Sequence, residues 1–522
     1  MQALRTDIAI IGGGLGACAA AIAVARVGRR VILTEETAWV GGQLTNQAVP
    51  PDEHPWIEEF GATASYRALR QGIREHYRRF TPLTATASSC LRLNPGNGWV
   101  SGLCHDPRVA VAVIHQMMLR YQLGGRLFIL RPHTPVAAST HGDRVSGVVV
   151  RSLESDRDTL IEAPFFIDAT PYGDLLALAG VEHVTGAESR ATTGEPHAAE
   201  HENPTDDQAV TVCFAIEHRV GEDHTIDKPR QYQLWREFQP PGWPGPLLGW
   251  TTPQPETHEQ LTRGLFESAD GKPWWRFRRI LDQSNFQSGF ACSDVTIVNW
   301  PQNDYWFGPI LGADPAERAR NLESARQLSL SLLYWMQTEA PRSDGGIGYP
   351  GLRLRGDVVG GTPDGLAPAP YVRSSRRIRA EFSVLEQHIA HPLRPDGPEL
   401  FEDSVGIGCY RIDLHPRVGG GGYLDLGCWP FQIPLGAMLP VRVENLLPGG
   451  KNLGVTHITN GAFRVHPVEW NVGESAGLLA AFCLEGNHVP RTVRHRPELL
   501  RAFQSLLTRQ GIELAWPSLR PV

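Results

Sequence analysis

One segment near the N-terminus constrains the fold more than any other. Residues 7–23 read DIAIIGGGLGACAAAIA, so a run of β-branched residues changes abruptly to glycines and then to alanines. The first five residues predict a buried strand, and the alanines begin a predicted helix of small and apolar residues. The turn between them fits G-x-G-x-x-A, in which Gly12 permits the sharp turn, Gly14 admits a diphosphate to the backbone and Ala17 lets the helix pack closely on the strand. The segment therefore predicts a dinucleotide-binding turn.

The next predicted strand supports the same interpretation. Residues 30–34, RVILT, lead into Glu35, which lies 23 positions after Gly12, where an acid that binds a ribose is expected. The N-terminus of the helix adds unpaired N–H groups and a partial positive charge for phosphates. A tight turn that only packs against a sheet would also use glycine, so this structural alternative stays open.

The segment after Glu35 distinguishes between dinucleotides. It reads ETAWVGGQLTNQAVPPDEH, and its Gly42 and Gln43 stand where a flavin, lying beyond its pyrophosphate, needs a close approach to the backbone. An NAD-binding domain would continue with regular strand and helix units, whereas this chain changes to an irregular segment of glycine and proline. The sequence therefore favours FAD over NAD.

Length and composition bound the class of protein. The chain has 522 residues, more than a usual single domain, and its 41% hydrophobic and 20% charged residues are ordinary for a globular enzyme. A net charge of −7 without a long Lys/Arg run argues against nucleic-acid binding, and no long uncharged apolar stretch predicts a membrane span. The first apolar stretch lacks a basic region and a cleavage site, so we expect a cytoplasmic protein. The eight cysteines form no C-x-x-C pair, so we expect no metal site.

Further segments fit the same nucleotide-binding domain. A helix, a Gly-Gly stop and a strand are predicted within 106–140, a hairpin with a Gly-Asp turn over 141–152, and a buried strand ending in Asp168 within 163–181. Residues 445–486 predict a strand, a polar loop and a helix from about Pro467, whose narrow start would stabilise negative charge on a reduced flavin. We expect an FAD-binding domain in 1–185 and 441–490, an inserted substrate or cap domain in 186–440, and a C-terminal helix and tail in 491–522.

Several of these motifs together resemble a known family. The stretches GGGLGA, GGQLT, NPGNGWVSGLC, PYVRSSRRI, PFQIPLGAMLP and KNLGVTHITNGAFRVHPVEWNVGESAG look like the FAD-dependent oxidoreductases sometimes labelled, misleadingly, xanthan lyase-like. The likeness covers roughly residues 5–485. It implies an α/β fold of the glutathione-reductase and fumarate-reductase type, with a Rossmann-like FAD-binding domain in separate pieces and an inserted substrate domain. Substrates across the family are poorly defined.

The resemblance also implies which residues contact FAD. They are Gly12, Gly14, Glu35, Gly42 and Gln43, with Val136 near the adenine and Asn452 and Gly473 near the ribityl chain or the flavin.

Three polar residues precede the C-terminal helix, where side chains could reach the flavin. His457, Arg464 and His466 are the catalytic candidates, because a histidine there is suited to proton transfer near neutral pH. The structural alternative is that His466 starts the helix and that Arg464 holds a carboxylate such as Glu469 or Glu474.

A second cluster, in PYVRSSRRI, offers groups that could bind a substrate. Tyr371, Arg373 and Arg376 could project toward the flavin, where arginine binds a carboxylate or phosphate in bidentate fashion. Alternatively, Arg376 and Arg377 join the inserted domain to the FAD-binding domain by ion pairs.

A third and weaker pair lies in the stretch YRIDLHP. Asp413 and His415 fall on one face of a strand, as a proton relay would need, although a pair that only stabilises a turn would look the same.

The inserted region is rich in tryptophan. Such residues stack on sugars and aromatic rings, but a core filled by large side chains is the more ordinary explanation. The residues are Trp235, Trp243, Trp250, Trp274 and Trp275.

Together these patterns predict an FAD-dependent oxidoreductase, either a dehydrogenase or an oxidase. A small organic substrate would transfer a hydride to flavin N5 while a histidine takes a proton, and oxygen, a quinone or another carrier would accept the electrons. One alternative is an FAD-dependent monooxygenase, although the stretch DATPYGD departs from the Gly-Asp pattern of those enzymes. The other is a protein that binds FAD without catalysis.

Overall fold

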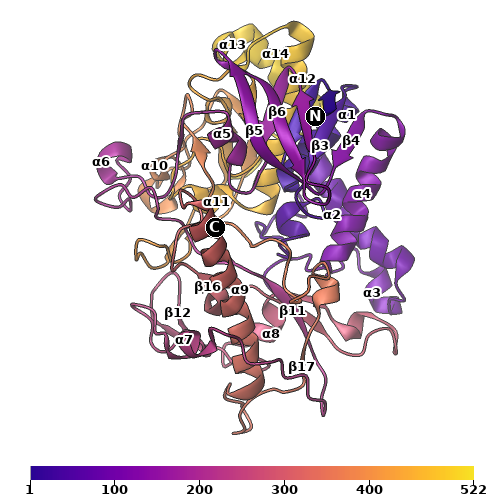
Figure 1. The fold of residues 1–522 in the computed structure, drawn as a ribbon, viewed down its shortest axis with the longest axis vertical. Helices are drawn as coiled ribbons and strands as arrows, with labels where there is room; N and C mark the ends of the chain where they lie inside the picture. The colour runs from indigo at the N-terminus through magenta and orange to yellow at the C-terminus, as the bar shows by residue number, and fades with distance from the viewer. Residues whose placement is uncertain (1) are drawn as a thin grey trace.

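The computed structural model describes residues 2–522, and a five-stranded parallel sheet forms its nucleotide-binding part (Figure 1). Four of the five strands come from the first third of the chain, and the fifth is contributed by a segment near the C-terminus. Strands that are buried on both faces read as continuous apolar runs, which is why IAII and FFID form interior strands. The order across the sheet is β23 (Leu446–Pro448), β8 (Phe165–Asp168), β2 (Ile8–Ile11), β3 (Val31–Thr34) and β4 (Leu127–Leu130).

A second, four-stranded sheet completes this part of the molecule. Its long antiparallel pair turns at Gly142, whose positive φ of 57° suits the predicted Gly-Asp turn. The predicted hairpin is confirmed, and it extends further toward the N-terminus than the range 141–152. The strands are β1 (Gln2–Arg5), β7 (Asp158–Glu162), β6 (Arg144–Ser152) and β5 (His133–His141), in that order.

Two helices from opposite ends of the chain pack against each other beside the first sheet. α1 (Leu15–Arg26) follows the glycine turn, and α12 (His466–Gly486) is the predicted C-terminal helix. A Cβ atom on Gly473 would lie 2.0 Å from the carbonyl oxygen of Gly16, so the two backbones touch directly. The contact brings the last element of the nucleotide-binding part onto its first.

The inserted region forms the lower half of the molecule as drawn in Figure 1. It contains an antiparallel sheet in the order β14 (Arg279–Leu281), β15 (Val295–Val298), β11 (Phe214–His218), β17 (Leu352–Leu354), and the long helix α9 (Pro315–Thr338). The five tryptophans named above from the sequence are buried in one apolar core, as the ordinary explanation requires, and Trp274 also lines a cavity described below: Trp235, Trp243, Trp250, Trp274 and Trp275.

Not all of the range 186–440 belongs to that lower core. Strands β19 (Ser404–Gly408) and β22 (Phe431–Pro434) pair with each other, and β19 packs on α12 and on the C-terminal helix α14 (Pro497–Arg509). Among residues 2–522, no helix combines the length and apolar character needed to cross a bilayer.

The remaining elements are short or connect these layers. The helices are α2 (Ala64–Phe80), α3 (Ala85–Ser89), α4 (Pro107–Leu123), α5 (Asp174–Leu178), α6 (Arg190–Thr193), α7 (Tyr232–Glu237), α8 (Trp274–Phe277), α10 (Glu386–Ile389), α11 (Asn460–Phe463) and α13 (Pro490–His495). The strands are β9 (His183–Val184), β10 (Val210–Thr211), β12 (Thr251–Pro253), β13 (Gln260–Thr262), β16 (Asp304–Tyr305), β18 (Arg377–Ile378), β20 (Ile412–Leu414) and β21 (Leu424–Leu426).

The contact between α1 and α12 can be tested with one methyl group. We expect Gly473→Ala to lower the free energy of unfolding by about 1–3 kcal/mol, because the methyl must separate the two helices. Helix propensity alone would change stability in the opposite direction. The measurement is urea unfolding. Gly245→Ala, where no atom lies within 4 Å of the added carbon, is the control. Equal stability of Gly473→Ala and wild type would contradict the close contact.

Candidate active site

The glycine turn is held by contacts that leave no room for side chains. Gly12 has a positive φ of 94°, its N–H donates to Thr34 Oγ1 at 3.0 Å, and a Cβ there would lie 2.5 Å from the backbone of Ala169. Gly14 precedes the first residue of α1, so the start of that helix faces the turn. Ala17 is fully buried in the helix, as predicted from the pattern. The turn is therefore as tight as the sequence predicts, its packing against Ala169 explains the glycine at position 12, and phosphate binding there stays a prediction.

Glu35 stands at the end of β3 beside this turn. Its Oε1 accepts hydrogen bonds from the N–H and hydroxyl of Thr37, at 2.8 and 2.7 Å, and from Asn46 Nδ2 at 3.0 Å. A Cβ on Gly13 would lie only 2.4 Å from Glu35 Oε2, so the carboxylate reaches the turn itself. Burial raises the pKa of Glu35 to about 7, although the bonds from Thr37 oppose that rise.

The loop of residues 41–47 lies directly on the glycine turn. Gly41 N–H donates to the carbonyl oxygen of Gly13 at 2.7 Å, and a Cβ on Gly42 would lie 2.9 Å from the Cα of Gly14. Buried amide oxygens in and next to this loop accept no hydrogen bond from residues 2–522: Gln43 Oε1, Asn46 Oδ1 and Gln47 Oε1. Unpaired buried acceptors suit a ligand rich in hydroxyl donors, such as the ribose and ribityl groups of FAD.

Gln43 connects this loop to the C-terminal helix. Its Nε2 donates to the carbonyl oxygen of Arg464 at 2.9 Å and to the carboxylate of Glu469. Glu469 Oε1 in turn accepts from Gly16 N–H at 3.3 Å, so this acid satisfies one of the free donors at the start of α1. The backbone N–H groups of Gly13 and Gly14 precede that of Gly16 in the turn.

The other three expected cofactor contacts lie in different settings. Val136 is half-buried on β5. Asn452 donates to the carbonyl oxygen of Asp168 at 2.8 Å and accepts from Gly450 N–H at 3.2 Å, which fixes it at the ends of β8 and β23. Gly473 faces Gly16, so its lack of a side chain serves the packing of the helices.

His466 is held by two hydrogen bonds at the start of α12. Its Nδ1 accepts from Asp52 N–H at 3.0 Å, and its Nε2 donates to the carbonyl oxygen of Val49 at 3.2 Å. Burial lowers its pKa, although Asp52 and Glu469 oppose the decrease. Both ring nitrogens are therefore engaged in a neutral imidazole, which fits the structural alternative for this residue.

Arg464 is buried and binds a different carboxylate from the two expected. Its Nη2 donates to Asp413 Oδ2 at 2.8 Å and its Nη1 donates to Tyr371 Oη at 2.6 Å. The expectation of Glu469 or Glu474 is wrong, because Glu469 is used by Gln43 and Gly16, as described above. Glu474 instead accepts from Arg26 at 2.7 Å and from Ser65.

Asp413 lies at the edge of a cavity of about 360 Å³, here called the aromatic cavity. Its walls carry large aromatic side chains, with Arg263 over the rings of Trp99 and Trp274, and the part lined by Arg373, Asp413 and His415 is here called its polar end. The residues used below are Trp99, Trp274, Phe277, Trp300, Arg278, Arg373, Asp413, His415 and Tyr423.

At the polar end, His415 and Asp304 form a hydrogen-bonded pair. His415 Nδ1 donates to Asp304 Oδ2 at 2.5 Å, and His415 Nε2 lies 3.6 Å from Asp413 Oδ2. Burial alone would raise the pKa of Asp304, but Arg373, with Nη2 at 3.1 Å, and His415 lower it below its usual value. The buried acid is therefore ionised and fixes the ring with Nε2 free of a close partner.

The charges around this pair balance one another. Arg373 is almost fully buried and also donates to the carbonyl oxygen of Ala209 and to Thr211 Oγ1, each at 2.8 Å. The pKa of Asp413 is well below its usual value, because His415 and Arg464 outweigh the effect of burial. No arginine in this cluster lacks a carboxylate.

Arg376 points away from the cavity toward the nucleotide-binding part. Its Nη1 donates to Asp174 Oδ1 and to the carbonyl oxygen of Tyr172, each at 3.0 Å. Arg377 bonds Glu188 at 2.8 Å. The ion pair of Arg376 with Asp174 fits the alternative in which these arginines join the inserted domain to the FAD-binding domain, whereas Arg377 pairs within the range 186–440 and does not.

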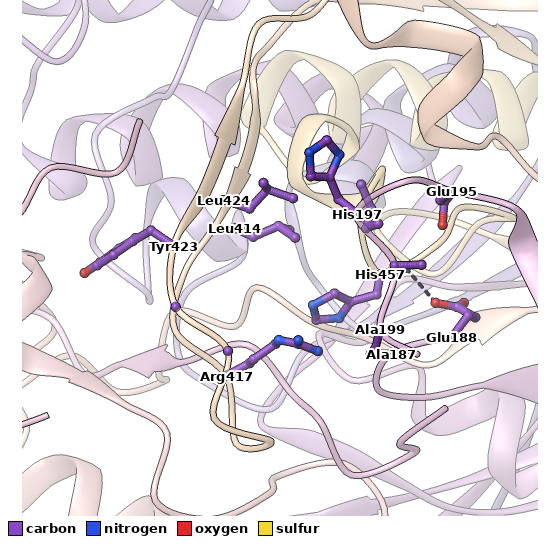
Figure 2. A pocket seen from close by; sticks show the side chains of 14 residues that line it. Ala187, Glu188, Glu195, His197, Ala199, Leu414, Arg417, Tyr423, Leu424 and His457 are labelled. Atoms are coloured by element: carbon purple, nitrogen blue, oxygen red, sulfur yellow. Dashed lines mark hydrogen bonds between the residues drawn. The ribbon is translucent and has the colours of Figure 1, made fainter. Parts of the chain in front are cut away.

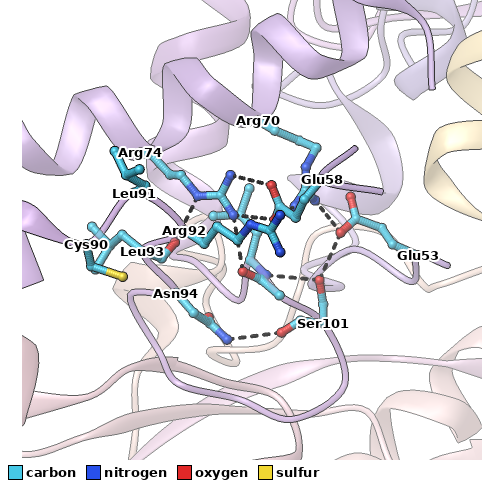
Figure 3. Close-up of polar contacts among 12 residues, drawn as sticks. Glu53, Glu58, Arg70, Arg74, Cys90, Leu91, Arg92, Leu93, Asn94 and Ser101 are labelled. Atoms are coloured by element: carbon cyan, nitrogen blue, oxygen red, sulfur yellow. Dashed lines mark hydrogen bonds and ion pairs between the residues drawn. The ribbon is translucent and has the colours of Figure 1, made fainter. Parts of the chain in front are cut away.

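A network that was not apparent from the sequence fixes the segment that follows the loop of residues 41–47, here called the cofactor loop (Figure 3). Arg70 on α2 pairs with both Glu53 and Glu58, and Arg74 Nη1 donates to Glu58 Oε2 at 2.9 Å. Glu53 immediately follows Asp52, whose carboxylate accepts from Arg278 in the aromatic cavity at 3.2 Å. The network therefore holds one wall of the cavity in place.

Comparison with known proteins identifies one family model over nearly the whole chain. The model is described as FAD dependent oxidoreductase and matches residues 7–507. No curated protein sequence matches significantly.

Matches to solved structures are distant. A geranylgeranyl bacteriochlorophyll reductase-like protein from Thermoplasma acidophilum is 9% identical over 98% of this chain and 85% of its own, with a TM-score of 0.34. The OxyS anhydrotetracycline hydroxylase from Streptomyces rimosus is 11% identical over 97% and 67%, with a TM-score of 0.35. L-proline dehydrogenase from P. horikoshii is 15% identical over 35% of this chain, with a TM-score of 0.18, and the match spans only 24% of that enzyme.

The raised pKa of Glu35 predicts a pH dependence of stability. The folded protein holds this proton up to a pH of about 7, whereas the unfolded chain loses it near 4.5. Stability of the cofactor-free protein should therefore fall as pH rises between these values, by up to about 3 kcal/mol. Glu35→Gln should remove this contribution, so its stability relative to wild type should increase across the window in urea unfolding at several pH values. Glu485→Gln, which alters an exposed acid, should run parallel to wild type. A parallel curve for Glu35→Gln would contradict the raised pKa.

Proposed function

This chain belongs to the FAD-dependent oxidoreductase family and is an enzyme that uses FAD, and we propose that it oxidises a small uncharged organic compound in the aromatic cavity. We further propose that residues 1–185 and 441–490 hold the cofactor and that 186–440 supplies most of the substrate pocket. The observation that carries the proposal is the pair of His415 and Asp304, because it offers an oriented base at the polar end of an aromatic pocket.

Charge balance in the pocket supports an uncharged substrate. The sequence suggests Arg373 as a group that grips a carboxylate, but Asp304 lies 3.1 Å from its Nη2. Arg464 and Arg278 are likewise paired with Asp413 and Asp52. A charged substrate would have to displace one of these buried pairs, and leaving a buried charge without a partner costs several kcal/mol. An alcohol on an aromatic body meets no such cost.

His415 is the residue that we propose to accept the substrate proton. Asp304 accepts from Nδ1, so Nε2 is the free acceptor, and the carboxylate of Asp413 at 3.6 Å would stabilise the imidazolium that forms. This assignment replaces His466, whose nitrogens are both engaged. Arg464 acts as a positioning residue that holds Asp413 and Tyr371.

FAD, when bound, supplies the acceptor for the hydride that leaves the substrate carbon. The contacts of this chain support a cofactor site next to the pocket, because Gln43 of the cofactor loop bonds the backbone of Arg464, and the Arg464 side chain bonds Asp413. The aromatic walls would exclude water from the reacting carbon.

Hydroxylation is a second candidate, favoured by the same aromatic lining. A monooxygenase inserts one atom of O₂ into the substrate and reduces the other to water, with electrons from NADH or NADPH. An experiment in the absence of oxygen distinguishes the two reactions. Under that condition a dehydrogenase or oxidase substrate reduces the flavin directly, whereas a hydroxylase substrate does not.

The first experiment is therefore anaerobic mixing of the holoenzyme with aromatic alcohols and, as their charged counterparts, aromatic alkyl amines, followed by flavin absorbance. We expect bleaching by one class, and we expect His415→Gln to slow that reduction by about 10²–10⁴-fold, the usual contribution of a general base. His201→Gln, which alters an exposed histidine, is the control.

Two results would contradict the proposal. Reduction of His415→Gln at the wild-type rate would exclude His415 as the base. Reduction only by NADH or NADPH, with an oxygen atom from ¹⁸O₂ appearing in the product, would favour the hydroxylase.

A further inference from the structure

A second cavity lies on the other side of the hairpin formed by β20 and β21. It has a volume of about 200 Å³, and its inner wall is formed by His457 (Figure 2). Leu414 and Leu424 of the hairpin line it, whereas their neighbours Asp413 and Asp425 line the aromatic cavity. Successive residues of a strand face opposite sides, so the hairpin stands between the two spaces, and Tyr423, just before β21, lines both. We call the second space the His457 cavity.

His457 is buried without a hydrogen-bond partner for its ring. Only 4% of the residue is exposed, and neither Nδ1 nor Nε2 contacts a polar atom of residues 2–522 within bonding distance. Its backbone N–H donates to Glu188 Oε2 at 2.9 Å, which fixes the residue in place. Leaving a buried polar group unpaired destabilises the folded protein, so a ring that lines a cavity calls for a polar partner inside it.

The protonation state of His457 limits what that partner can be. Burial, together with the nearby Arg377 and Arg417, holds the pKa of His457 well below its usual value. The ring is therefore neutral at physiological pH and offers one N–H donor and one nitrogen acceptor. A hydroxyl group, which both donates and accepts, can bond either nitrogen.

The charged groups around the cavity are already paired. Arg377 Nη2 donates to Glu188 at 2.8 Å, and Arg417 pairs with Asp206. Glu195 accepts from Thr456 Oγ1 at 2.7 Å. An anion would face Glu188 and Glu195, and a cation would face Arg417 with Arg377 nearby, so neither is favoured. His197, whose Nδ1 bonds Glu386, and Tyr423 also line the cavity. The apolar part of the wall comes from Ala187, Ala198, Ala199, Leu414, Leu424 and Ile458.

We propose that the His457 cavity is a second binding site, separate from the aromatic cavity, for a small uncharged alcohol or phenol. The hydroxyl bonds the ring of His457, and the apolar body lies against the alanine and leucine side chains. The site is independent of the redox reaction proposed above, because it uses none of the residues assigned to that reaction.

The two cavities each contain a histidine that can report on its own occupancy. We would label the holoenzyme with ¹³Cε1-histidine, assign His457 and His415 with the variants His457→Phe and His415→Gln, and titrate with phenol. We expect a saturable shift of the His457 resonance, whatever the response of His415. Benzoate, the matched anion, should bind this site at least tenfold more weakly.

A variant that fills the cavity controls for indirect effects. Ala199 is half-buried on the 186–200 segment and bonds its neighbours only through its backbone, so Ala199→Trp occupies the space while His457 stays intact. We expect this variant to keep its flavin and melting temperature and to lose the phenol-dependent shift.

Either of two results would overturn the proposal. One is a His457 resonance that does not move up to the solubility limit of phenol, which would mean that water alone fills the cavity. The other is an unchanged shift in Ala199→Trp, which would mean that phenol acts from elsewhere. If no aromatic alcohol reduces the flavin but phenol still shifts the His457 resonance, only the redox proposal is contradicted.

Discussion

The direct contact between two helix backbones is the constraint on which the nucleotide-binding part depends. Gly16 and Gly473 have no side chains, so α1 and α12 approach closely enough for the backbones to touch. Gly16 also lies against the carbonyl oxygen of Gly449, where a Cβ would be 1.9 Å away. The same small residues thus place the start of α1, the end of β23 and the first turns of α12 around one point. Gly473, which the family resemblance assigns to a cofactor contact, thus serves the packing of the two helices.

From this point a chain of buried polar contacts leads to the aromatic cavity. Gln43 bonds the backbone of Arg464, Arg464 bonds Asp413, and Asp413 lies beside His415. Each arginine in this series of polar contacts has a carboxylate partner. Together the paired groups hold the imidazole of His415 and leave no net charge for a substrate to neutralise. Polar networks of this kind fix geometry more than they add stability, since burying the charges offsets much of their attraction.

The sequence predicted the local elements better than the site. Strand β2, helix α1 and Glu35 follow from periodicity, glycine spacing and the distance along the chain, all of which are local. The parallel sheet was anticipated for the same reason, whereas the FAD family was anticipated from the resemblance of several motifs to a known family. Asp304 could not be linked to His415, because the two are 111 positions apart and no short motif joins them. The partner of Arg464 was predicted wrongly, since nearby acids in the sequence, Glu469 and Glu474, are used by other groups once the helix is packed.

Completion of the central sheet by β23 has a consequence for biosynthesis. On the ribosome, the glycine turn and Glu35 emerge early. The strand and helix that close their surroundings, β23 and α12, lie within residues 446–486 and emerge much later. A nascent chain therefore exposes an open edge of apolar sheet at β8 until residues 446–448 have been made. The surroundings of the glycine turn are complete only after α12 has followed, so a truncated product that stops before α12 would have the glycine turn without the helix that packs on it.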